Sequence, residues 1–142
     1  MTTSTDAGHR LVTHSTEYEV EAWAPDRAGC FLEALHGLLD EFVVPGEGPA
    51  VRSLPLAAPS GGPEEMLASL LEEVVLSLVV FSVVPVRFHL VDTEDGGVTG
   101  DMEVIPLARA TLRGTAPKAI SRRGLSMSID GGVWCCRYVA EV

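Results

Sequence analysis

The amino-acid sequence predicts an α+β fold in which two helices pack on one face of a mostly antiparallel β-sheet. In two segments the apolar residues recur every three or four positions, which is the period of an amphipathic helix. Around them lie several short segments that alternate apolar and polar residues, as half-buried strands do. We expect one domain over residues 10–142, preceded by a polar, flexible tail at residues 1–9.

The first strand and the first helix follow one another directly. Residues 18–24, Tyr-Glu-Val-Glu-Ala-Trp-Ala, alternate and predict a strand. Asp26 is placed to cap the next helix, because its carboxylate can accept hydrogen bonds from the free N–H groups of the first turn. The apolar face of this helix comprises Phe31, Leu35, Leu38, Leu39 and Phe42. The Pro45-Gly46 pair is predicted to mark its end.

The second helix is predicted to begin at Pro63, which suits a first helical position. The stretch before it is rich in Pro and Gly and predicts loops with one edge strand, residues 51–56, because proline cannot donate to a sheet. Glu64 and Glu65 lie near the positive end of the helix dipole. The apolar face comprises Leu67, Leu70, Leu71, Val74 and Leu78. Beyond Val75 the segment is apolar on all sides, so we expect it to be deeply buried or to turn into extended chain.

Most of the remaining sequence predicts strands. The candidates are residues 86–90, 101–107, 108–112, 125–129 and 133–140. The segment 92–97, Asp-Thr-Glu-Asp-Gly-Gly, has the composition of a turn. Asp130-Gly131-Gly132 predicts a hairpin between the last two candidates, because glycine accepts the left-handed backbone of a tight turn.

Composition and charge exclude several classes of protein. Apolar residues make up 46 % of the chain and charged residues 21 %, which excludes intrinsic disorder. The formal net charge of −10 repels phosphate backbones, so we expect no DNA partner and no autonomous RNA binding. The longest apolar run, residues 74–86, is too short to cross a membrane, and the N-terminal segment lacks the pattern of a secretory signal. The cytoplasm is therefore the predicted location.

The sequence contains none of the common catalytic signatures. It has no G-x-S-x-G nucleophile elbow, phosphate-binding loop, dinucleotide glycine fingerprint or H-E-x-x-H zinc motif, so an enzyme is not the favoured class. The three cysteines, Cys30, Cys135 and Cys136, form no C-x-x-C pair and are too few for a disulfide framework. We expect them to be reduced packing residues, with the adjacent pair pointing to opposite faces of a strand.

Half of the ten basic side chains fall within a short stretch of this acidic chain. They are Arg109, Arg113, Lys118, Arg122 and Arg123. Such a cluster can form a contact patch for RNA or for an acidic partner, or it can balance the acids of neighbouring strands.

A series of short segments follows the order and spacing of one known family. His14-Ser15-Thr16-Glu17 precedes the first strand and Ala22-Trp23 ends it. The later segments are Phe31, Ala34, Leu35 and Leu38, then Glu73, Val84-Pro85, Lys118-Ala119, Gly124-Leu125 and residues 132–142. Together they resemble the archease family over residues 9–142, where the first segments read H-T-A-D, A-W-G and E-A-F-x-x-A-x-x-x-L.

The resemblance implies a two-layer α+β sandwich and an accessory role. Archeases are acidic proteins that promote guanylylation and turnover of the RtcB-type tRNA-splicing RNA ligase, so such a ligase is the implied partner and RNA is contacted only through it. The divalent cation of the family, calcium first with magnesium or manganese as alternatives, would here be held by Glu17, Glu141 and the terminal carboxylate of Val142. The residues that would support these ligands or contact the partner are His14, Glu73 and Lys118.

Two departures from the family pattern leave other functions open. Both side-chain ligands are glutamates rather than aspartates, and the D-T-E-G that the family carries after its second helix is replaced by residues 79–82, Val-Val-Phe-Ser. One alternative is a stand-alone binding or assembly module that has lost the ligase-activating role. Another is a hydrolase that uses Glu17 and Glu141 as acid and base.

Overall fold

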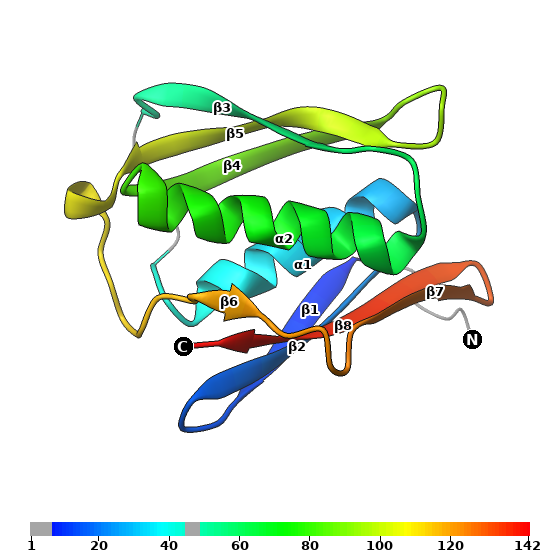
Figure 1. Ribbon diagram of the computed structural model, residues 1–142, viewed down its shortest axis with the longest axis horizontal. Helices are drawn as coiled ribbons and strands as arrows, with labels where there is room; N and C mark the ends of the chain where they lie inside the picture. The colour runs from blue at the N-terminus through cyan, green and yellow to red at the C-terminus, as the bar shows by residue number, and fades with distance from the viewer. Residues whose placement is uncertain (1–6, 45–48) are drawn as a thin grey trace.

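The computed structural model describes residues 7–44 and 49–142, which form two antiparallel β-sheets and two helices (Figure 1). The larger sheet has the order β1-β2-β8-β6, and β7 also pairs with β8. Its strands are β1 (Gly8–Thr13), β2 (Glu17–Ala24), β6 (Ala119–Ile120), β7 (Ser126–Asp130) and β8 (Val133–Glu141). The smaller sheet has the order β3-β5-β4, with β3 (Arg52–Ala58), β4 (Val83–Asp92) and β5 (Val98–Pro106).

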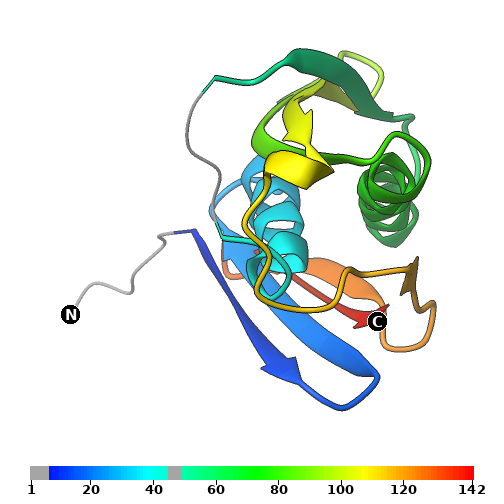
Figure 2. The same cartoon turned by 90° about the vertical axis from the view of Figure 1, so that its left-hand side faces the viewer.

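The two helices form a layer between the sheets (Figure 1, Figure 2). Helix α1 (Arg27–Asp40) contacts β1, β2 and β8 on one side and β4 on the other, and α2 (Pro63–Val80) contacts β6 and β7 as well as β3 and β4. The predicted α+β class with two helices and antiparallel strands is confirmed. The arrangement differs from the expected two layers, because α2 buries consecutive residues such as Met66, Leu67 and Ala68. Side chains on several sides of a helix need more than one sheet to cover them.

Both helices begin where the sequence predicts. The side chain of Asp26 caps α1 by accepting a hydrogen bond of 2.6 Å from the Gly29 N–H. Pro63 opens α2, with Glu64 and Glu65 in its first turn. The Pro45-Gly46 pair, predicted to mark the end of the first helix, lies outside the described residues. Neither helix of the described chain combines the length and apolar composition that crossing a bilayer requires.

Several strand predictions differ from the structure. Residues 108–112 are not a strand: a short 3₁₀ helix (Leu107–Arg109) turns the chain, and Leu112 makes only an isolated bridge to Val43. The turn forms because the Leu107 carbonyl accepts from the Ala110 N–H at 3.0 Å, which redirects the backbone away from a sheet. Strands β1 and β6 were not predicted. Because β1 begins at Gly8, the predicted tail at residues 1–9 ends too late, and residues 1–6 lie outside the described part.

Two buried tyrosines fasten the larger sheet to α1. The hydroxyl of Tyr18 on β2 donates to the Leu38 carbonyl at 2.6 Å, and the hydroxyl of Tyr138 on β8 donates to the Ala34 carbonyl at 2.7 Å. Burial raises the pKa of both hydroxyls, so they stay protonated donors. The two strands that carry Glu17 and the chain end are thus fixed against the same helix.

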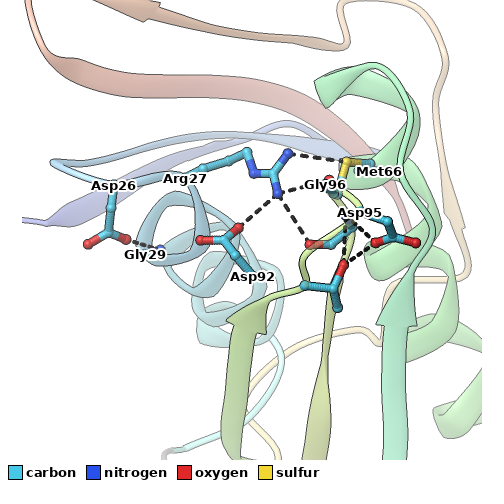
Figure 3. A network of polar contacts seen from close by, with 9 residues as sticks. Asp26, Arg27, Gly29, Met66, Asp92, Asp95 and Gly96 are labelled. Atoms are coloured by element: carbon cyan, nitrogen blue, oxygen red, sulfur yellow. Dashed lines mark hydrogen bonds and ion pairs between the residues drawn. The ribbon is translucent and has the colours of Figure 1, made fainter.

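One arginine connects both helices to the smaller sheet (Figure 3). The guanidinium of Arg27, at the start of α1, donates to the Asp92 carboxylate at 2.8 Å and to the Gly96 and Gly97 carbonyls at 3.0 and 3.3 Å. Its other terminal nitrogen lies 3.7 Å from the sulfur of Met66 on α2. The turn between β4 and β5 is therefore held against the beginnings of both helices.

The three cysteines are free thiols. Cys30 and Cys136 are buried, as predicted, and Cys30 packs under β2 with its thiol 3.7 Å from the Ala22 carbonyl. Cys135 is exposed, so the prediction of a packing role is wrong for this residue. It differs because neighbouring residues on β8 point to opposite faces of the sheet, as the sequence pattern indicated.

Candidate functional site

Two glutamates face each other where β2 begins and β8 ends. Glu17 and Glu141 are register partners in the antiparallel pair of β2 and β8. Directly opposite residues of such a pair extend from the same face of the sheet, so the two carboxylates share one side of it. Like charges in this position destabilise a sheet unless positive charge compensates them. The glutamate pair therefore concentrates negative charge at the end of β2 and β8.

The end of the chain is held beside this pair. The Val142 N–H donates to the Thr16 carbonyl at 3.0 Å, and the Val142 side chain packs against the core. The Lys118 N–H donates to the Glu141 carbonyl at 2.8 Å from the other side of β8. These contacts prevent the fraying that is usual at a terminus. We call Glu17, Glu141 and the α-carboxylate of Val142 the carboxylate edge.

The donor set of the carboxylate edge suits a hard cation. All three groups offer carboxylate oxygens, which calcium and magnesium prefer as ligands. In the described part of the chain, no three histidine, cysteine or acidic side chains gather in a metal-binding cluster, so at the carboxylate edge the side chains offer two ligands and the third would be the α-carboxylate. Arg123 already supplies one positive charge, with Nη2 4.0 Å from Oε2 of Glu17, although its side chain is largely exposed. A bound cation would compete with this weak, solvent-screened pair.

The other predicted site residues lie at different places. His14 is exposed in the turn between β1 and β2, where its N–H donates to the Glu17 carbonyl at 2.7 Å. Lys118 is exposed next to β6, and its backbone supports the chain end. Glu73 lies on α2 in the wall of a groove, away from the ends of β2 and β8. The structure therefore brings His14 and Lys118 to the carboxylate edge and leaves Glu73 outside it.

The basic cluster is largely engaged with acidic and carbonyl groups. Arg122 donates to the Glu72 carboxylate at 2.7 Å, and Arg113 donates to the Asp40 carbonyl at 2.8 Å. With Arg123 beside Glu17, three of the five basic residues have such neighbours. The acidic neighbours favour the charge-balancing interpretation over a free RNA-binding patch for Arg122 and Arg123, while Arg113 is held by a backbone carbonyl.

The end of α2 holds a surface that sequence reasoning missed. Residues beyond Val75 were predicted to be deeply buried or extended, but the helix continues to Val80 and four large apolar side chains are exposed. They are Leu76, Val79, Val80 and Phe81, with exposed fractions between 48 % and 66 %. No local signal identifies them, because an all-round apolar helix end has the same sequence pattern whether or not a partner element covers it.

Comparisons with known proteins define the class of this α+β domain by its sequence family. The sequence model of the archease protein family (MTH1598/TM1083) matches residues 9–142, and the chain belongs to this family. The probable protein archease of Mycobacterium tuberculosis strain H37Rv is 31 % identical over 138 residues, which cover 97 % of this chain and 76 % of the relative. The probable protein archease of strain CDC 1551 gives the same values.

Two solved structures share the fold. The solution structure of Methanobacterium thermoautotrophicum protein 1598 superposes with a TM-score of 0.76 at 14 % identity, covering 95 % of this chain and 99 % of the other. The crystal structure of an archease from Thermotoga maritima, described as a possible chaperone, gives 0.63 at 18 % identity and covers 94 % and 96 % of the two chains. At these identities the likeness concerns the fold alone.

Proposed function

We propose that this chain is an accessory protein that promotes guanylylation and turnover of an RtcB-type RNA ligase in tRNA splicing or RNA repair. It acts in the cytoplasm, catalyses no reaction alone and reaches RNA only through the ligase. Membership of the archease family supports this function. The observation that carries it is the pairing of Glu17 with Glu141 beside a chain end that is held by hydrogen bonds.

The carboxylate edge is the proposed site of a divalent cation. Glu17, Glu141 and the α-carboxylate of Val142 would hold it, with calcium as the first candidate and magnesium or manganese as alternatives. When bound, the cation would supply positive charge, which either attracts phosphate oxygens or orders the edge at which the partner docks. The protein's own contribution is to hold the ligands, since the N–H groups of Lys118 and Val142 hold the last strand in register. His14 lies in the adjoining turn, where it flanks Glu17.

The test is a guanylylation assay with the RNA ligase of the same organism. The purified chain, GTP and a divalent metal should raise the yield of guanylylated ligase above that of ligase alone. Glu141→Gln should lower this stimulation about tenfold or more, because it removes one ligand charge without changing size. The matched control is Glu94→Gln, which makes the same charge change in the exposed turn between β4 and β5.

The assay also separates the alternatives. Failure of the wild-type chain to stimulate the ligase at stoichiometric excess would favour a stand-alone binding module. Turnover of phosphoester or glycoside substrates without any partner would favour the hydrolase.

A further inference from the structure

A groove runs along the solvent-exposed side of α2. Its larger part has a volume of about 540 Å³ and is lined by α2 together with residues 59–61 and Arg122. A smaller hollow of about 150 Å³ lies between α2 and the smaller sheet, and ends at Phe81. Glu73 and Leu76 line both hollows, so the two are adjacent. We call this surface the α2 groove.

The two ends of the α2 groove differ in chemistry. Glu65, Glu72 and Glu73 line the N-terminal part, where Arg122 is the single cation of the lining and lies 2.7 Å from Glu72 and 4.0 Å from Glu65. Three carboxylates facing one guanidinium leave this part negative. At the other end, the exposed side chains of Leu76 and Phe81 line the smaller hollow, and the exposed Val79 and Val80 belong to the same end of the helix. Such patches on soluble proteins commonly mark interaction sites.

Charge identifies the kind of occupant that fits. The chain carries a formal charge of −10, so a second copy would bring its own acids against those of the groove. RNA is repelled for the same reason. A protein surface that combines basic side chains with an apolar anchor matches both ends of the groove, since the bases meet the glutamates while the anchor meets residues 76–81.

We propose that the α2 groove is the docking surface for a cationic protein face bearing an apolar anchor. Naming the RNA ligase as that protein rests on the proposed function: an enzyme that holds RNA carries basic surface to bind phosphates. The groove adjoins the carboxylate edge through two consecutive arginines, because Arg122 contacts Glu72 in the groove while Arg123 lies 4.0 Å from Glu17. The groove and the carboxylate edge are thus linked through one short segment of the chain.

The experiment measures the affinity of the full chain for the RNA ligase of the same organism by titration calorimetry. Replacing Leu76 and Phe81 together by Gln should weaken binding about tenfold or more, because the apolar lining of the groove is lost. Glu72→Lys with Glu73→Lys should weaken it at least as much, and raising the salt concentration should weaken wild-type binding. Both pairs are exposed, so folding is retained and is checked by circular dichroism.

The matched control is Val91→Gln, which removes an exposed apolar side chain, 62 % accessible, from β4 on the smaller sheet, outside the groove lining. It should bind the ligase as the wild type does. Equal affinity of the wild type and both groove variants would overturn the docking proposal while leaving the stimulation assay intact. Loss of binding in the groove variants without any stimulation by the wild type would support the groove and reject the proposed function.

Two further results would overturn the docking proposal. One is the absence of any binding between the wild-type chain and the ligase, which rejects the proposed function as well. The other is a dimer of the chain, seen by light scattering, that the groove variants dissolve.

Discussion

A single histidine connects the edge strand β1 to α1. The ring of His9 lies beside Gly37, where an added Cβ would come within 2.6 Å of Val20 on β2 and 3.4 Å of the His9 ring, so the glycine lets the sheet pack closely on α1. Its Nδ1 lies 2.8 Å from the Glu33 carboxylate and its Nε2 contacts Asp40. Glu33, Gly37 and Asp40 are spaced by four and three residues, so they share one face of the helix. The imidazole therefore bridges two acids across the boundary between the larger sheet and α1.

This bridge predicts a pH-dependent stability. Burial alone would lower the pKa of His9, but the hydrogen bonds and charges of Asp40 and Glu33 outweigh burial and raise it above 6.5. Because the pKa of His9 is higher in the folded chain than in the unfolded chain, the protonated imidazole stabilises the fold below pH 6.5. This stabilisation is lost as the pH rises through the pKa of the folded state. The thermal midpoint should fall over that range in the wild type and less steeply in His9→Gln. His14→Gln, at an exposed ring, is the control, and identical slopes in all three proteins would refute the role of the bridge.

At the scale of secondary structure, elements specified by local residues were predictable. Asp26 and Pro63 mark the two helix starts, and Asp130 with two glycines at positive φ forms the hairpin of β7 and β8. Strands β1 and β6 carry no such signal: β1 is exposed over half of its length, and β6 has two residues paired with the end of β8. Their existence depends on partners that are distant in the sequence.

The candidate site shows the same limit. Glu17 and Glu141 lie near opposite ends of the chain, so no spacing rule pairs them, and only the resemblance to a family did. In the structure the antiparallel register of β2 and β8 joins them. Neither spacing rules nor the family resemblance predicted the exposed apolar end of α2, because the exposure of a side chain depends on how the other elements cover it.

The pairing of β2 with β8 predicts stabilisation by calcium. A ligand that binds only the folded state at about 100 times its dissociation constant adds about 2.7 kcal/mol, which raises the thermal midpoint by several degrees. Calcium should have this effect on the wild type and on Glu94→Gln, and a smaller one on Glu141→Gln. A glycine appended after Val142 should abolish it, because the α-carboxylate is displaced from the edge. If millimolar calcium leaves the thermal midpoint of the wild type unchanged, calcium has no place in the proposed function.

At the scale of the whole molecule, the two sheets are joined through the helices. No strand pairing connects the sheets in the described residues, so the relative position of the sheets depends on the helix layer and on polar contacts such as those of Arg27. The larger sheet carries the carboxylate edge, while the smaller one forms a wall of the α2 groove. The alignment of the two surfaces thus depends on how firmly the helices hold both sheets.

Replacing Arg27 by Met tests this connection. The change keeps most of the apolar stem but removes the guanidinium, whose Cζ lies 6.0 Å from the centre of the Phe31 ring. It also removes the hydrogen bonds to Asp92, Gly96 and Gly97, which join α1 to the turn of the smaller sheet. Because the Arg27 side chain is only 21 % exposed, we expect a loss of about 2 kcal/mol in the free energy of unfolding, measured by urea denaturation.

The matched control for Arg27→Met is Arg10→Met. Arg10 pairs with Glu21 at 2.9 Å within the larger sheet, but its side chain is 69 % exposed, so its loss should cost less than about 1 kcal/mol. If the α2 groove and the carboxylate edge must be aligned for docking, Arg27→Met should also weaken ligase binding at temperatures where the protein remains folded. Arg10→Met should leave that affinity unchanged. Equal unfolding free energies for the two variants would show that the helix layer alone holds the sheets together, without the arginine.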